Sequence, residues 1–115
     1  MSQNKLLSLL GLARRAGMLS LGHDPAIEAM QNRRTELVLV ACDLSKRTLK
    51  GVCAAAEQTQ TTLLGLRETI EEITAALGRR VGVIAVNDAG FANKMRAEYK
   101  IDTMIRRNRS YDEEI

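Results

Sequence analysis

The 115-residue sequence is poor in aromatic residues: it contains no Trp, and Phe91, Tyr99 and Tyr111 are its only aromatic side chains. Proteins that bind single-stranded nucleic acid without sequence preference usually stack the bases on aromatic rings. This chain offers almost nothing on which bases can stack, so that mode of binding is not expected. The scarcity also means that the core must be built from Leu, Ile, Val, Ala and Met.

The chain also has a single histidine, His23, and two cysteines, Cys42 and Cys53. The cysteines lack the Cys or Cys/His spacing of a metal site, so we expect no metal centre. Both fall in apolar segments, which predicts reduced, buried thiols of a cytoplasmic protein. A nucleophilic Cys42 would have to use His23 as its base, and we interpret both residues as non-catalytic.

Motifs of nucleotide chemistry and of membrane proteins are missing as well. The sequence has no GxGxxG fingerprint and no GxxxxGK[ST] phosphate-binding loop. The acidic pair Glu71 and Glu72 is explained by the first turn of a helix, where the helix dipole favours negative charge. No apolar run is long enough to span a membrane, and the first residues do not read as an export signal. We expect a protein that is not an enzyme and needs no cofactor.

The length allows one domain, because 115 residues are too few for two independent cores. We assign residues 1–101 to this domain. Residues 102–115 mix arginines and acids without periodicity, and we expect them to form a flexible tail. No long apolar stripe is left over once the core is filled, which favours a monomer.

Helical and extended patterns alternate along the domain. Apolar spacing predicts helices at residues 5–16, 25–32, 46–57, 70–78 and 89–99, and apolar runs predict strands at 36–42, 61–64 and 81–86. The run at 36–42 is continuously apolar, so we expect it to be the central strand, covered on both faces. The alternation favours a three-layer α/β/α sandwich around a small, mainly parallel sheet.

Residues at the predicted helix ends act as start and stop signals. Asp24 is the expected N-cap of the second helix, with Pro25 at its first position, and Asp43 or Ser45 caps the third. Thr69 and Glu72 have the spacing of a capping box, which predicts the start of the fourth helix. Gly17 and Gly78 are the expected stops of the first and fourth helices, and Asn87-Asp88 is the expected cap of the last. These signals give the element boundaries on which the site prediction rests.

Positive charge is modest in total but clustered. The formal net charge is +3, and basic residues occur in groups, namely Arg14-Arg15, Arg33-Arg34, Lys46-Arg47 with Lys50, Arg79-Arg80, and Arg106-Arg107 with Arg109. Any single pair can be a solvated surface. Several pairs at the ends of elements, converging on one edge, favour a polyanionic partner.

Several segments resemble a known family. The two most specific are Leu-Gly-Leu-Ala-Arg-Arg-Ala-Gly at residues 10–17 and Asn-Asp-x-Gly-Phe-Ala-x-Lys at residues 87–94. The apolar run at 37–43 and the segment 76–92 add to the resemblance. With them the chain resembles the ribosomal protein L7Ae superfamily and, within it, the short bacterial YlxQ-like proteins, over about residues 4 to 98.

The resemblance implies an α/β/α sandwich with a mixed sheet, an additional edge strand near Leu19, and binding of kink-turn or related bulged RNA. It places the RNA-facing surface on three segments: the start of the second helix, the loop after the central strand, and the loop before the last strand. We call this the three-segment surface; it comprises Gly22, His23, Asp24, Pro25 and Glu28, then Asp43, Leu44 and Ser45 with Lys46 and Arg47 beside them, then Leu77, Gly78, Arg79 and Arg80.

The chain departs from that family at the start of the second helix. Members that bind a kink-turn tightly have Asn-Glu there and a Lys one turn later, whereas this chain has Asp24, Pro25 and Glu28. Asp24 offers only acceptors, Pro25 lacks a backbone donor, and Glu28 repels phosphate. Two hypotheses follow: binding of structured RNA linked to ribosomes, translation or RNA processing, with ribosomal or RNA-processing proteins as further partners, or a protein-interaction module that has lost RNA affinity.

Overall fold

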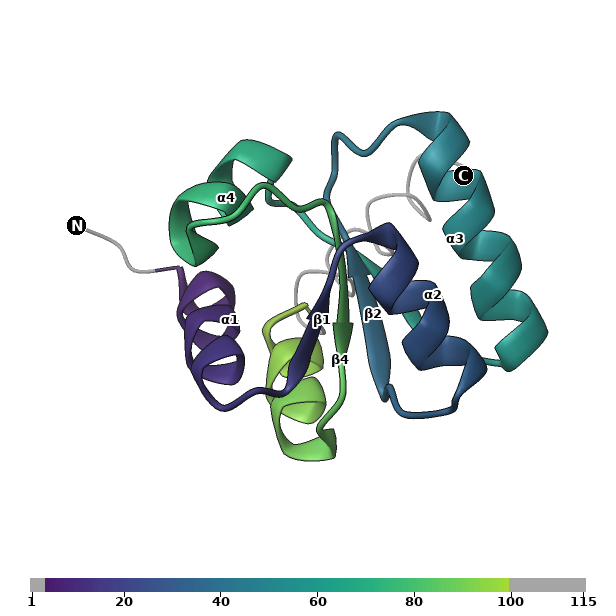
Figure 1. Ribbon diagram of the computed structural model, residues 1–115. Helices are drawn as coiled ribbons and strands as arrows, with labels where there is room; N and C mark the ends of the chain where they lie inside the picture. The colour runs from purple at the N-terminus through teal and green to yellow at the C-terminus, as the bar shows by residue number, and fades with distance from the viewer. Residues whose placement is uncertain (1–3, 100–115) are drawn as a thin grey trace, which may run out of the picture.

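The computed structural model describes residues 4–99 (Figure 1). The predicted tail at 102–115 lies outside the described residues. Within these residues five helices and four strands alternate, in the order α1 (Lys5–Arg15), β1 (Leu19–Leu21), α2 (His23–Gln31), β2 (Leu37–Val40), α3 (Lys46–Thr59), β3 (Leu63–Gly65), α4 (Ile70–Leu77), β4 (Val83–Val86) and a last helix over residues 89–99. None of the helices in this described part is long and apolar enough to cross a membrane.

The sheet has the strand order β1-β4-β2-β3. β2 and β3 are parallel, but β4 is antiparallel to both β1 and β2, so the mixed sheet is confirmed and the mainly parallel sheet is a wrong prediction. The reason lies in α4, which packs against α1. It does not carry the chain back to the end of the sheet where β2 and β3 begin, so β4 starts at the end where they finish and runs the other way. The Ala41 amide donates to the Gly82 carbonyl (2.9 Å), so β4 begins beside the end of β2.

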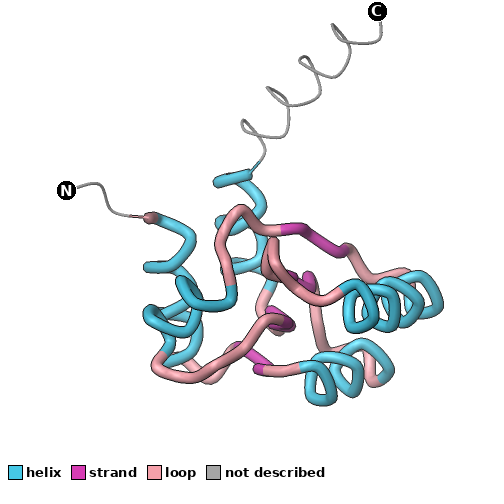
Figure 2. The backbone as a smooth tube through the Cα atoms, turned by 90° about the horizontal axis from the view of Figure 1, so that it is seen from above, coloured by secondary structure: helices cyan, strands magenta, loops and turns pink. Residues whose placement is uncertain are grey.

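Two hydrophobic layers cover the two faces of the sheet. α1, α4 and the last helix lie on one face, and α2 and α3 lie on the other (Figures 1 and 2). Successive residues of β2 alternate between them: Leu37 and Leu39 join the first layer, and Val38 and Val40 join the second. All four are at most 4% exposed, which confirms the central, doubly covered strand predicted from its unbroken apolar run.

Most predicted helix ends are confirmed, because their signals are local. Ser45 caps α3 through the Thr48 amide, Thr69 and Glu72 form the capping box of α4, and Asp88 accepts from the Phe91 amide (2.9 Å) in the last helix. α1 ends just before Gly17, which adopts a φ of 73°.

The prediction for Asp24 is wrong. α2 begins at His23 and its N-cap is Gly22, which has no side chain to cap the helix. Asp24 instead accepts from Nδ1 of His23 (2.9 Å) and remains exposed. Pro25 therefore occupies the third helical position, where it costs no hydrogen bond because the first turn of a helix has no intrahelical acceptor for its amides.

The prediction that Cys42 and Cys53 are buried is also wrong, since both are free and exposed. Cys42 lies just past the end of β2, beyond the covered part of the strand. Cys53 lies on α3, where Val52 and Ala56 are the buried residues, so the helix turns its sulfur away from the sheet. An apolar stretch marks a helix but does not tell which of its residues face the core.

A buried carboxylate fastens the ends of three elements. Glu68, after β3, is 3% exposed; its carboxylate accepts from the Tyr99 hydroxyl and from Nδ2 of Asn4, the N-cap of α1 (2.6 Å). The Tyr99 oxygen accepts in turn from the Arg67 amide (3.0 Å), and the Arg67 guanidinium lies over the Tyr99 ring. Burial and the hydrogen bond to Glu68 raise the pKa of Tyr99 from 10.0 to about 12.

Candidate nucleic-acid interface

The three segments singled out from the sequence meet at one edge of the sheet. β1 is antiparallel to β4, so the end of β1 and the start of β4 coincide, and the Gly22 amide donates to the Val83 carbonyl (2.8 Å). The end of β2 joins them through the bond from Ala41 to Gly82. The start of α2, the loop after β2 and the loop before β4 are therefore side by side.

The start of α2 presents backbone at this edge. Gly22 has a φ of 108°, a conformation that suits glycine and strains other residues. Within the described residues, the amides of His23 and Asp24 donate to no protein acceptor, and they lie at the positive end of the helix dipole. Such an N-terminus can bind a phosphate or a base acceptor.

The loop after β2 is fixed to the start of α4 and to the loop before β4. Asp43 Oδ1 accepts from the Ile70 amide (2.8 Å), and Leu44 packs so closely on Gly82 that a Cβ there would lie 2.9 Å from its Cδ1. Leu44 is half-buried, whereas Lys46 and Arg47 are exposed in the first turn of α3. The loop therefore has a rigid base and a charged outer end.

The loop before β4 contributes arginines. α4 ends at Gly78, whose φ of 72° turns the chain, and Arg79 and Arg80 that follow are exposed. Leu77 is 5% exposed and belongs to the core, which corrects its assignment to the surface. The last turn of α4 covers the core there, so Gly78, Arg79 and Arg80 form the exposed part of this segment.

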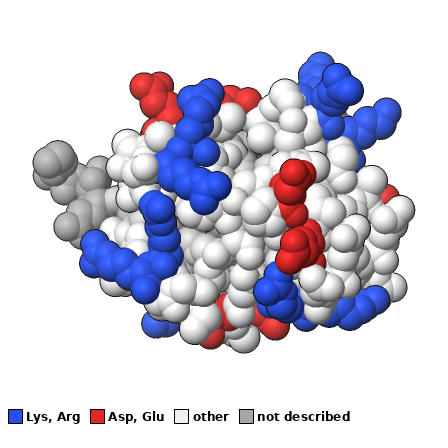
Figure 3. Space-filling view, in the orientation of Figure 1, with Lys and Arg blue, Asp and Glu red and all other residues white. Residues whose placement is uncertain are grey.

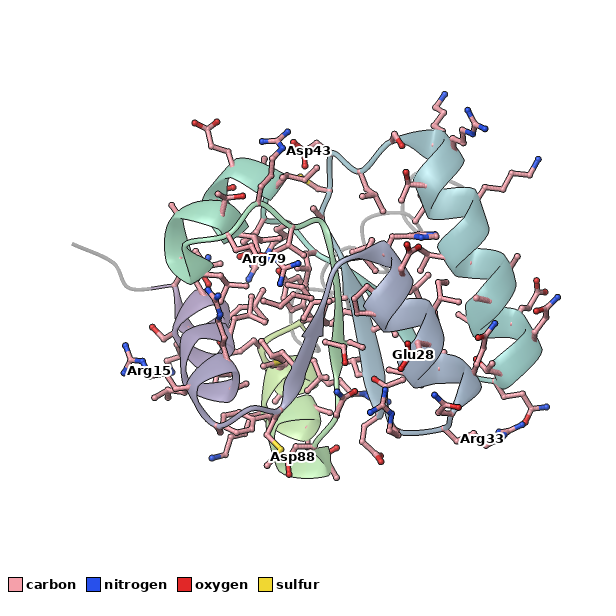
Figure 4. The ribbon with its side chains drawn as sticks, viewed as in Figure 1. Arg15, Glu28, Arg33, Asp43, Arg79 and Asp88 are labelled. Atoms are coloured by element: carbon pink, nitrogen blue, oxygen red, sulfur yellow. The ribbon has the colours of Figure 1, made fainter. Side chains whose placement is uncertain are left out.

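Charge on this side of the molecule is divided. Figure 3 shows basic side chains toward α1 and α4 and again at the start of α3, with acidic side chains between them over α2. Glu28 lies farther along α2 than the edge itself (Figure 4). It pairs with Arg34 at 3.3 Å, and both side chains are more than half exposed. A polyanion would therefore be attracted by the basic side chains on either side and repelled by the acidic side chains over α2.

The part of the chain that the structure describes contains no cluster of side chains that could bind a metal ion. No three His, Cys, Asp or Glu side chains there lie close enough together to hold an ion. The edge offers instead backbone amides, arginines and carboxylates, which are hydrogen-bonding and ionic groups suited to recognition.

Comparisons with known proteins agree with this architecture. None of the protein-family models matches the chain. A 15.5 kDa RNA-binding protein of Giardia lamblia superposes with a TM-score of 0.67 at 14% identity, covering 84% of this chain and 87% of that one. A protein of unknown function from Bacillus halodurans superposes with a TM-score of 0.77 at 33% identity, covering 83% and 96%. The chain thus shares the fold of these two proteins.

Two curated relatives narrow the assignment. The RNA-binding protein YlxQ of Bacillus subtilis is 37% identical over 100 residues, covering 83% of this chain and 95% of the relative. The protein of the same name from Enterococcus faecium is 33% identical over 93 residues, covering 81% and 89%. The chain belongs to the YlxQ family.

Sequence reasoning overlooked one neighbour of this edge. A Cβ on Gly78 would lie 4.0 Å from Nη1 of Arg14, so the guanidinium of Arg14 on α1 lies beside the loop before β4. The cluster Arg14-Arg15 was visible in the sequence, but Arg14 and Gly78 are 64 positions apart, and only the packing of α1 on α4 brings them together.

Proposed function

We propose that this chain binds structured RNA of the kink-turn or a related bulged type through the three-segment surface, without catalysis. The observation that carries the proposal is the meeting of the three segments at one edge, with free helix amides between clusters of exposed basic residues. The names of the YlxQ relatives, which are RNA-binding proteins, support it.

The geometry favours a bulge over a plain duplex. The amides at the start of α2 and the arginines after Gly78 face the same edge, so one ligand can present base edges to the first and phosphates to the second. Sequence-specific recognition of RNA uses unpaired or splayed bases, because side chains cannot read the deep major groove of an RNA helix. A bulged or kinked segment supplies such bases beside intact backbone.

The proposal includes a cellular setting. Binding of ribosomal or other non-coding RNA would link the protein to ribosomes, translation or RNA processing, with the proteins of those assemblies as further partners. The proposal also places the protein in the cytoplasm, and two exposed cysteines that are free thiols fit the reducing environment there.

The test is an affinity measurement with a labelled RNA duplex interrupted by a bulge and adjoining G·A pairs, against a fully paired duplex. Replacing both arginines, Arg79→Ala with Arg80→Ala, should weaken binding to the bulged RNA about tenfold or more, because charge-assisted contacts contribute roughly 1.5 to 3 kcal/mol each. Arg33→Gln, which removes one charge beyond the far end of α2, should change affinity less than about twofold.

Equal affinity of the wild type and the double variant would sink this placement of the site. Absence of any preference of the wild type for the bulged RNA would contradict the proposed function itself, and the protein-interaction module would then be the better account of Asp24, Pro25 and Glu28.

A further inference from the structure

A groove between α1 and α4 adjoins the three-segment surface. It has a volume of about 390 Å³ and is lined by Gly11, Arg14, Arg15, Ala76 and Leu77. Its upper end is the loop before β4, where the Arg14 guanidinium lies next to Gly78. Figure 4 shows Arg79 between α1 and β1, and Arg15 on the outer flank of α1. The groove therefore adjoins the loop through Arg14.

The arginines of this surface have no counter-charge within residues 4–99. Arg14, Arg15, Arg79 and Arg80 form no ion pair there, whereas Arg34 pairs with Glu28. The acids of α4, Glu71 and Glu72, lie in its first turn, at the opposite end of the helix from the groove. These four arginines, on α1 and in the loop before β4, thus carry positive charge that no ion pair within residues 4–99 neutralises.

Helix capping does not account for Arg14 and Arg15. The last carbonyls of α1 are already satisfied by backbone: Leu12 accepts from Ala16 (3.0 Å), and Ala13 accepts from Met18 (2.9 Å). The dipole of α1 favours a cation near this end, but it does not require a guanidinium that reaches the neighbouring loop.

The groove is also kept open by small residues. Gly11 lies inside α1, where glycine is less stable than alanine, and a Cβ built on it meets no atom within 4 Å. Ala76 faces it from α4. Larger side chains would fit at position 11 and would fill a channel that now gives access to the arginines.

We propose that the α1–α4 groove, as defined by its five lining residues, binds the phosphate backbone of a helical RNA arm that continues from the bulge. The inference rests on the proposed function and extends the site beyond the three segments. Arginine suits this role because its planar guanidinium can donate two parallel hydrogen bonds to one phosphate. A shallow groove without aromatic rings can hold a backbone, which needs no stacking.

The test compares Gly11→Glu with Gly11→Gln. Both variants fit the open space and should raise the melting temperature of the protein, because both replace a helical glycine with a better helix former. Glutamate adds a carboxylate three and four residues before the two arginines and neutralises them, while glutamine adds the same bulk without charge. We expect Gly11→Glu to bind bulged RNA with long arms about tenfold more weakly than Gly11→Gln.

The arm assignment is tested with bulged RNAs in which one arm and then the other is shortened. Loss of the difference between the two variants when one particular arm is removed would support the proposal. An equal difference on every RNA would overturn it, because the charge would then act on the bulge itself.

The outcome separates this inference from the proposed function. If Gly11→Glu and Gly11→Gln both bind long-armed RNA as tightly as the wild type while Arg79→Ala with Arg80→Ala binds more weakly, the groove is not used and the three-segment surface stands. If the wild type does not prefer bulged RNA, both fail.

Discussion

At the scale of the residue, the clearest link between distant elements of the fold is Glu68. It is a charged side chain with 3% exposure, and burying an unpaired carboxylate would be costly. Hydrogen bonds from Tyr99 and Asn4 satisfy both of its oxygens and tie the last helix and α1 to the segment after β3. The residue was not singled out from the sequence, because nothing local marks a carboxylate that is satisfied from two distant helices.

The raised pKa of Tyr99 predicts a loss of stability in alkali. With a pKa of about 12 in the folded state and 10.0 as the ordinary value, the unfolded chain loses its tyrosine proton first as the pH rises. The contribution to the free energy of unfolding is complete below pH 10 and disappears as the pH approaches about 12; it amounts to up to about 3 kcal/mol.

Denaturant titrations of the wild type and Tyr99→Phe between pH 8 and 12 check this prediction. The variant should be less stable near neutral pH by about 1 to 3 kcal/mol, because Glu68 and the Arg67 amide each lose a partner. Its stability should then fall less steeply above pH 10. Parallel curves for the two proteins would show that Tyr99 does not titrate as described.

At the scale of the element, the start of α2 combines attraction and repulsion. Free amides favour an anion, but Asp24 is 97% exposed beside them and Glu28 is exposed one turn later. Both carboxylates are explained in part without RNA, since Asp24 lies at the positive end of the helix and Glu28 pairs with Arg34. Their electrostatic effect on a phosphate nearby is nevertheless unfavourable.

Reversing one of these charges should strengthen RNA binding. Glu28→Lys is expected to raise the affinity for bulged RNA about tenfold, because repulsion is replaced by a phosphate contact. Glu36→Lys, an exposed residue just before β2, makes the same change in net charge at the opposite edge of the sheet and serves as the control. Equal gains in the two variants would mean that only net charge matters and that α2 does not face the RNA.

Element boundaries were predictable where the signal is local. The capping box at Thr69 and Glu72 depends on residues three apart, and glycine stops at Gly17 and Gly78 depend on one residue. The start of α2 could not be predicted from local signals, because Gly22 is held by a hydrogen bond to Val83, on a strand far along the chain. Pro25 is compatible with several early helical positions and could not decide among them.

At the scale of the molecule, the layers could be predicted and the strand directions could not. Alternating helices and strands require helices on both faces of a sheet, and the two hydrophobic layers have that arrangement. The direction of β4 depends on α4 packing against α1, which no local pattern records. The same packing places Arg14 at the candidate site, so the groove between α1 and α4 could not be predicted from the sequence either.

The most direct measurement of the central claim is the affinity for bulged RNA as a function of salt concentration, for the wild type and for Arg79→Ala with Arg80→Ala. Each neutralised phosphate makes log affinity fall with log salt by roughly 0.7 to 0.9. The account predicts a steep slope for the wild type and a slope smaller by about one to two in the double variant. Identical slopes for the two proteins, or an affinity independent of salt, would contradict it.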